Sequence, residues 1–372
     1  MCGASVFGCR EDPTSPGDPQ RPPTTGGVGT TDTGGSSSGG GSTGVGGLIS
    51  TGGSMGGGPA TTGGADATID LWYGDDQIFG MQGGPAPQRD VNVLGTVSGA
   101  LLKDASYSVN GGEAVALPLG PDGERLIGPG QFNIELDRAS LKKVPETNRL
   151  AITANVAGGD FLTKEFTLRV YEAKSVGFPF EVDWNALDDV AQVNQVAAIV
   201  DGTWALENDG VTVVDKGYDR LIALGDQTWA GNYDVLATFT LHGWNAWGSV
   251  GLAVGWQGHE GNASPRVDWP LEGLTWVRNV VPEPEMQIMT FERGVQERRP
   301  FSLALDTPYY LRAHTTRTGP NARVSMRIWR TDQKEPDAWQ LSSVTKAHDG
   351  SVLLIAHHSH VTWGPVRVEA VP

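Results

Sequence analysis

The sequence predicts an all-β protein in which two packed-sheet domains follow a low-complexity N-terminal segment. Three observations support this fold class. Strand-like runs separated by Gly, Pro and Asn turns recur throughout residues 66–372. Helical periodicity is nearly absent, and only residues 187–193 are expected to form a helical turn or two. Residues 10–65 consist of little besides Gly, Ser, Thr and Pro.

Composition and charge exclude several classes of partner. The 372 residues carry a formal net charge of −16. A negative field repels nucleic acid and anionic membrane surfaces, so no nucleic-acid partner is expected. Acidic polysaccharide is disfavoured for the same reason, unless a local basic patch or a cation intervenes. No apolar run reaches the roughly 18 residues of a membrane span, so any membrane contact is expected through a lipid anchor only.

The first nine residues predict such an anchor. Val6-Phe7-Gly8-Cys9 resembles the end of a bacterial lipoprotein signal, with a small residue directly before the cysteine. The resemblance implies a partial signal over residues 1–9, lipidation of Cys9, and a secreted protein held at the bacterial cell envelope or outer surface. No basic segment or full apolar segment precedes the motif, which departs from the pattern. The alternative is that Cys2 and Cys9 stay free or form a disulfide with each other.

Residues 10–65 predict a disordered tether. They contain repeated TGG and SGGG elements and few apolar side chains. Such a segment buries too little apolar surface to offset the entropy lost on ordering. A flexible chain of this length spans roughly 40 Å on average, which suits a tether between an anchor and a folded domain.

Residues 66–173 predict a small β-domain. Turn signals such as Asn110-Gly111-Gly112 and Gly120-Pro121-Asp122-Gly123 separate short strands. The segments 105–112 and 148–160 resemble a hairpin and a late strand of bacterial Ig-like modules, which implies an Ig-like sandwich that serves as a spacer. The seven expected strands are 67–73, 90–97, 105–109, 114–117, 131–136, 149–156 and 164–171.

Residues 174–372 predict a larger sandwich, because so many strands would curl or split into two sheets. Its fifteen expected strands are 180–183, 195–200, 203–207, 211–214, 220–224, 233–242, 249–256, 274–278, 285–290, 297–304, 309–316, 322–330, 339–344, 351–357 and 361–369. The runs 233–240, 251–256, 309–313, 335–339 and 361–368 resemble strands of the concanavalin A-like lectin/glucanase jelly roll, in its laminin-G-like branch. The resemblance implies a jelly-roll sandwich whose ligands bind the concave sheet and its rim.

The stretch 231–276 is expected to hold the binding site. It combines two long strands, a Trp-rich turn at 243–248 and a polar loop at 257–270. Aromatic faces beside hydrogen-bonding side chains are what a sugar-binding surface needs. We therefore predict glycan binding by Trp stacking and by Gln and His hydrogen bonds. The predicted ligand contacts are Trp244, Trp247, Trp256, Gln257, His259, Trp269 and His358.

Metal and catalytic motifs are weak. His357, His358 and His360 invite a zinc interpretation, but strand geometry divides them between two faces. No cofactor is expected apart from a structural calcium ion, which is common in jelly rolls. Its candidate ligands, which no spacing singles out, are Asp183, Asp188, Asp189 and Asp201.

Two alternatives to a lectin-like function stay open. A polysaccharide-degrading enzyme, either a glycoside hydrolase or a lyase, would place a general base such as His259 beside a carboxylate. The E-x-D-x-x-E strand of the retaining glucanases of this fold is absent. Gln257-Gly258-His259 resembles the Q-[IV]-H strand of alginate-lyase-like jelly rolls only weakly, because it lies in a Gly-containing loop. A structural or adhesive surface protein without a sugar site would instead bury all its Trp rings.

Overall fold

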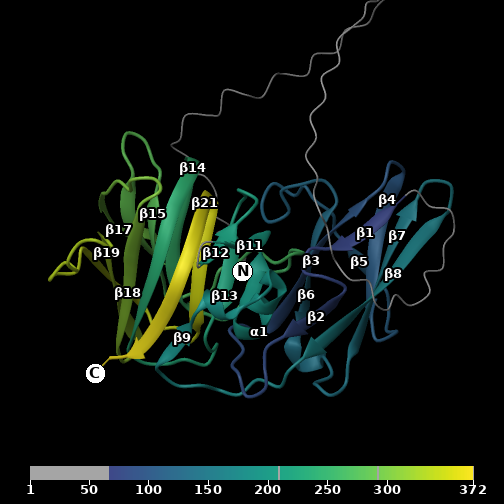
Figure 1. Ribbon diagram of the computed structural model, residues 1–372, viewed down its shortest axis with the longest axis horizontal. Helices are drawn as coiled ribbons and strands as arrows, with labels where there is room; N and C mark the ends of the chain where they lie inside the picture. The colour runs from purple at the N-terminus through teal and green to yellow at the C-terminus, as the bar shows by residue number, and fades with distance from the viewer. Residues whose placement is uncertain (1–66, 208–209, 291–292, 372) are drawn as a thin grey trace, which may run out of the picture. The chain divides into compact units, whose positions relative to one another are not determined.

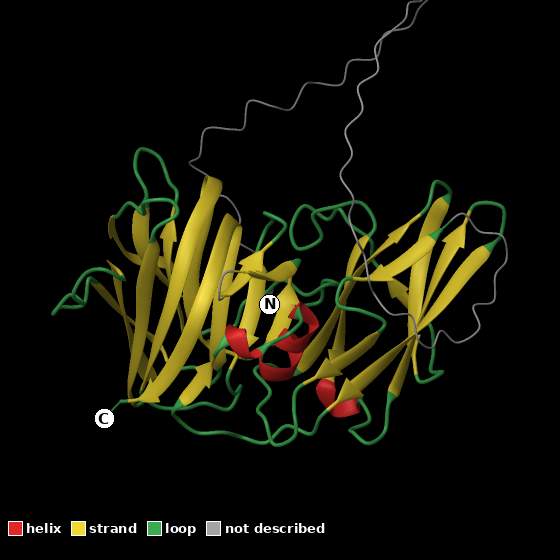
Figure 2. Ribbon diagram, in the orientation of Figure 1, coloured by secondary structure: helices red, strands yellow, loops and turns green. Residues whose placement is uncertain are grey.

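A computed structural model describes residues 67–207, 210–290 and 293–371, and it is built almost entirely of strands (Figure 2). The all-β, sandwich-like fold class is thus confirmed. Cys9, the expected signal over residues 1–9 and the expected tether over residues 10–65 lie outside the described residues. Within the described residues, no helix is long and apolar enough to cross a membrane.

The region 67–173 forms two sheets around one apolar core. A three-stranded sheet has the order β1-β3-β6, and a five-stranded sheet has the order β2-β8-β7-β4-β5. Val93, Phe132 and Leu150 are buried at the centre of this core. The strands are β1 (Thr68–Leu71), β2 (Asp76–Phe79), β3 (Asp90–Ser98), β4 (Leu102–Val109), β5 (Val115–Leu117), β6 (Gln131–Asp137), β7 (Asn148–Val156) and β8 (Phe161–Val170).

All seven strands expected in this region are present, and the sequence missed one. The missed strand is β2, which has four residues and pairs in parallel with β8. Its buried residues, Gln77 and Phe79, alternate with more exposed ones, but the run is too short for that alternation to predict a strand.

The region 174–371 forms one 13-stranded hydrogen-bonded network. A continuous path runs β10-β13-β21-β14-β15-β16-β17. Off this path, β9 and β12 pair with β21, and β11 pairs with β12, while β18 pairs with β14 and continues through β19 to β20. The strands are β9 (Phe180–Val182), β10 (Ala198–Asp201), β11 (Trp204–Glu207), β12 (Gly210–Val213), β13 (Arg220–Leu224), β14 (Tyr233–Trp256), β15 (Gly273–Arg278), β16 (Glu285–Thr290), β17 (Gly294–Pro300), β18 (Pro308–Thr318), β19 (Asn321–Arg330), β20 (Leu341–Lys346) and β21 (Ser351–Ala370).

Two long strands lie at the centre of this network. β14 has 24 residues and β21 has 20, and they lie side by side along almost their whole length (Figure 1). The sequence predicts two strands in place of each, and for β14 a turn over residues 243–248. The structure has one strand in place of the two, but residues 245–248 have no partner in β21, because the register shifts between the Trp244–Ser359 and Ser249–His357 pairs.

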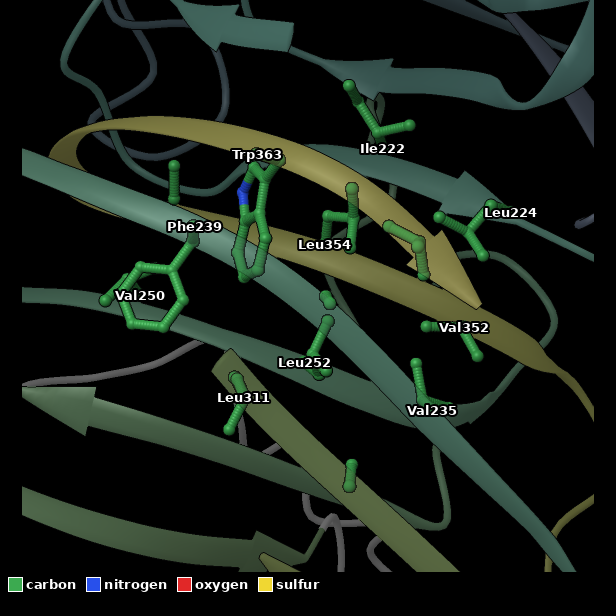
Figure 3. Packing of buried hydrophobic residues seen from close by; sticks show 14 of the residues in the cluster. Ile222, Leu224, Val235, Phe239, Val250, Leu252, Leu311, Val352, Leu354 and Trp363 are labelled. Carbon is green, nitrogen blue, oxygen red and sulfur yellow. The ribbon is translucent and has the colours of Figure 1, made fainter. Parts of the chain in front are cut away.

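The shifts divide each long strand between two layers. Residues 233–240 of β14 pair with β18, whereas residues 249–254 pair with β15. Side chains from both halves meet in one buried cluster, in which Val235 and Phe239 pack with Val250, Leu252 and Trp363 (Figure 3). The network therefore folds over on itself, and its inner faces enclose the core.

The expected helical segment is present in a fragmented form. Residues 184–196 contain two 3₁₀ turns, Trp184–Ala186 and Val190–Gln192, and the one-turn α-helix α1 (Val193–Val196). Asp183 and Asp189 cap the two 3₁₀ turns with their carboxylates.

A buried ion pair joins the two regions, which belong to one compact unit. Arg125 Nε donates to Asp201 Oδ2 over 2.6 Å, and both side chains are 1% exposed. Asn133 Nδ2 donates to Asp201 Oδ1, and Arg125 also binds Glu135. A buried charge is tolerated only when paired in this way. The domain boundary expected at 173/174 remains a prediction.

Truncation of the shared core should destabilise the whole C-terminal sandwich. Leu252 is fully buried between the two layers. Leu252→Ala should lower the free energy of unfolding, measured by urea denaturation, by about 2–5 kcal/mol through lost burial and a residual cavity. Val344 is 45% exposed, so Val344→Ala is the control and should change stability by less than about 0.5 kcal/mol. Equal effects of the two variants would contradict the described core.

Candidate functional site

Four strands place polar side chains in one row across the outer face of the sheet. His357 of β21 lies opposite Ser249 of β14, Ser249 lies opposite Arg278 of β15, and Arg278 lies opposite Glu285 of β16. Directly opposed residues share a face, so these side chains point the same way. Asp219, directly before β13, extends the row by a hydrogen bond to His357.

The next row on this face carries an indole and an amide. Gly251 lies opposite Trp276, and Trp276 lies opposite Gln287. Trp276 Nε1 donates to Gln287 Oε1 over 3.0 Å, and Gln287 Nε2 donates to Glu285 Oε2 over 3.1 Å. Trp276 and Gln287 are buried, and they lie beside the first row on the same face.

The Trp-rich segment of β14 lies beside Arg278 and is tightly held. Trp247 N–H donates to the Asn279 carbonyl, and Asn279 N–H donates to the Gly248 carbonyl. Asn279 Nδ2 also donates to the Asn245 carbonyl. A Cβ on Gly248 would lie 2.7 Å from the Trp244 Cβ and 2.9 Å from the His358 carbonyl, so glycine permits this close approach.

Backbone strain is concentrated at this corner. In the described residues, the non-glycine residues with positive φ are Asn110, Asp219, Trp247, Asp306 and His358. Asp219, Trp247 and His358, with φ of 47°, 69° and 46°, contribute to the cluster around the row. Such a conformation is unusual for bulky side chains, costs about 1–3 kcal/mol each, and tends to occur at functional sites.

The strained residues bring three rings together. The His357 and His358 centroids are 4.5 Å apart, and Tyr218 lies 5.0 Å from His357 and 6.0 Å from His358. Asp219 Oδ1 lies 2.7 Å from His357 Nδ1. This contact fixes the His357 ring and leaves Nε2 as its other polar atom.

Arg278 is an unpaired cation held between two indoles. Its guanidinium carbon lies 5.6 Å from the Trp247 centroid and 5.4 Å from the Trp276 centroid, within the range of cation–π attraction. Its Nε is buried and has no hydrogen-bond partner. Among the described residues no carboxylate pairs with Arg278, and Glu285 across the strand lies 4.0 Å from Arg298 instead.

His358 is neutral at pH 7 in this setting. Burial, together with the neighbouring His357, Arg220 and Arg278, lowers the pKa of its imidazole to about 4, against the opposing effect of Asp219. The side chain is only partly exposed. It therefore offers ligand hydrogen bonds without a positive charge.

The structure divides the predicted ligand contacts into two groups. Trp247 and His358 lie at the corner, and Trp244 is nearby but packs against the main core. Trp256, His259 and Trp269 form a separate cluster, with ring centroids 4.8–5.5 Å apart. All three are buried, and Trp256 is 0% exposed, so it has no open ring face for a sugar.

The second group supports the polar loop rather than a stacking surface. Burial holds the pKa of His259 well below its usual value, and its two ring nitrogens have no hydrogen-bond partners. Gln257 bonds the Gln227 carbonyl. On the loop, Asn262 and Arg266 line a pocket of about 280 Å³ that also contains Tyr107 and Glu135. Arg266 and Glu135 pair with each other there.

Metal ligation is not favoured by the described side chains. Across residues 67–207, 210–290 and 293–371, no group of three His, Cys, Asp or Glu side chains is placed to hold a metal ion. Asp183 and Asp189 act as caps, and Asp201 pairs with Arg125. A structural calcium ion remains a prediction.

Sequence reasoning missed most residues of the row and its surroundings. No recognisable motif pointed to Tyr218, Asp219, Trp276, Arg278 or Gln287. The alternation of Trp276 and Arg278 along β15 was readable from the sequence. Their position beside His357 was not, because it depends on strand order and register.

Comparisons with known proteins show only distant likenesses. No family model matches the chain, and no curated protein matches it. Among solved structures, the legume lectin-like domain from Entamoeba histolytica aligns at 7% identity and a TM-score of 0.33, covering 46% of this chain and 88% of that chain. Peanut lectin aligns at 6% identity and a TM-score of 0.36, covering 52% and 98%. A bifunctional GH43-CE protein from Bacteroides eggerthii aligns at 11% and 0.38, covering 77% and 40%. Likenesses at these identities and TM-scores assign this chain neither to a family nor to a function.

The pKa of His358 provides a test of the corner geometry. The His358 ring signal should titrate with a midpoint of about 4 in an NMR pH titration. Arg278→Gln should raise this midpoint, because it removes a nearby positive charge. Since the folded pKa lies below the unfolded value, the contribution of His358 to stability is full above about pH 6.5 and declines as pH falls toward 4. A midpoint near 6.5 would show that the ring is solvated and that the cluster is not formed.

Proposed function

We propose that this protein binds carbohydrate at the corner of the C-terminal sandwich, on a surface formed by Tyr218, Trp247, Arg278 and His358. The observation that carries the proposal is the convergence of strained residues there: Asp219, Trp247 and His358 adopt positive φ. The strain holds rings and hydrogen-bonding groups together that an unstrained strand would separate. A surface of this kind suits the mixed polar and apolar faces of a sugar ring.

The exposure of the corner side chains supports binding over a purely structural role. Tyr218, Trp244, Trp247 and His358 are partly exposed, whereas Trp276 and Gln287 in the adjacent row are buried. A structural protein without a sugar site was expected to bury all its Trp rings. The partly exposed indoles at this corner count against that alternative.

The setting of this domain remains part of the proposal. An Ig-like spacer, a concanavalin A-like jelly roll, lipidation of Cys9 and location at a bacterial cell surface all fit the sequence resemblances. In such a protein the corner would face glycans outside the cell.

Trp247 should be central to retention on polysaccharide. In affinity gel electrophoresis of the full chain against a panel of soluble polysaccharides, Trp247→Ala should weaken retention about fivefold or more through lost stacking. Trp339 is the matched control, because it is a partly exposed indole elsewhere, packed by His314 and Arg327. Trp339→Ala should leave retention unchanged. Equal retention of the wild type and Trp247→Ala would refute the site.

An enzyme is the second candidate, and the Asp219–His357 hydrogen bond favours it. A carboxylate that orients an imidazole is the arrangement of a general base. A two-carboxylate hydrolase is disfavoured, because Asp219 and Glu285 lie four strand spacings apart in the row, roughly 19 Å, against about 5–10 Å in glycosidases.

Turnover separates the two candidates. Incubation of the full chain with each retained polysaccharide should release no new reducing ends or unsaturated products if the protein only binds. Product that disappears in His357→Ala, while retention persists, would replace the binding proposal with an enzymatic one.

A further inference from the structure

Arg278 is the cation on this face that the described residues leave unsatisfied. Three other arginines of the C-terminal sandwich and its junction pair with carboxylates: Arg125 with Asp201, Arg317 with Glu272, and Arg327 with Glu335. Arg278 instead has cation–π contacts on two sides and a buried Nε without a partner. The buried Nε of this half-buried, unpaired guanidinium costs free energy that an anionic partner would offset.

The neighbours of Arg278 do not fill that role. Glu285 lies opposite it in the β15–β16 register but accepts from Gln287 and lies near Arg298. Asp219 is bound to His357. His358 is neutral at pH 7, so it adds hydrogen-bonding capacity without competing for an anion.

We infer that Arg278 binds the anionic group of an acidic saccharide, a carboxylate or a sulfate ester, while the sugar ring packs on Trp247 or Tyr218. The inference rests on the proposed function and specifies the class of its ligand. The two flanking indoles orient the planar guanidinium, which suits two parallel hydrogen bonds to a carboxylate or sulfate.

The charge of the whole chain limits the ligand further. A net charge of −16 repels a polyanion at long range. A single unpaired arginine on a net acidic protein therefore favours a glycan with isolated anionic residues over a densely charged polymer. An acidic saccharide can bind this acidic protein only where a local positive charge, here Arg278, offsets the repulsion.

The test compares matched ligands on the full chain by ligand-observed NMR and calorimetry. The probes are methyl glucuronide, glucose 6-sulfate and neutral methyl glucoside. The wild type should bind at least one anionic probe about tenfold or more tightly than the glucoside, and added NaCl should reduce that preference. The probe that binds identifies whether the group is a carboxylate or a sulfate.

Variants assign the preference to one residue. Arg278→Gln should remove the preference for the anionic probe. Arg278→Lys should retain part of it, because the positive charge remains but the paired N–H donors of the planar guanidinium are lost. Arg298→Gln is the matched control, since Arg298 is exposed on β17 near Glu285, and it should bind like the wild type. Thermal unfolding of each variant confirms that it is folded.

The outcomes separate this inference from the proposed function. Equal binding of neutral and anionic probes, unchanged in Arg278→Gln, overturns the inference and leaves carbohydrate binding intact. Absence of binding by all three probes, together with no retention of any polysaccharide, overturns both.

Discussion

The pairing of β14 with β21 from one end to the other is the constraint on which the rest of the C-terminal sandwich depends. Both strands begin in one layer and end in the other, so each must turn a corner without losing its partner. Register shifts and positive φ at Trp247 and His358 absorb the change of direction. The same corner that closes the fold thus presents the side chains of the candidate site.

The outer face of the sheet behaves differently at its two ends. Around Trp256, His259 and Trp269 the aromatic rings are packed away under the 257–270 loop. Around Trp247 and His358 the rings stay partly exposed, and an arginine stays unpaired. Aromatic residues near one another in sequence therefore differ in their setting: one group packs in the interior, and the other is partly exposed at the corner.

Local pattern predicted the strands well, because alternation and turn residues act over a few positions. It failed where long-range pairing decides the outcome. The Trp-rich segment 243–248 has the composition of a turn, yet its first two residues pair with β21, and Trp247 and Gly248 exchange backbone hydrogen bonds with Asn279. The sequence predicts Trp247 and His358 as ligand contacts, whereas Arg278 and Asp219 reach the same corner only through strand order, and ligand contact by any of them stays a prediction. Burial of Trp256 could not be read from sequence, since an indole suits a core as well as a sugar.

A crystal structure of the full chain bound to an oligosaccharide that it retains would test the central claim most directly. The account predicts sugar density against Trp247, with a polar group of the ligand within hydrogen-bonding distance of the Arg278 guanidinium. Density confined to the pocket beside Asn262 and Arg266, with the corner empty, would contradict it.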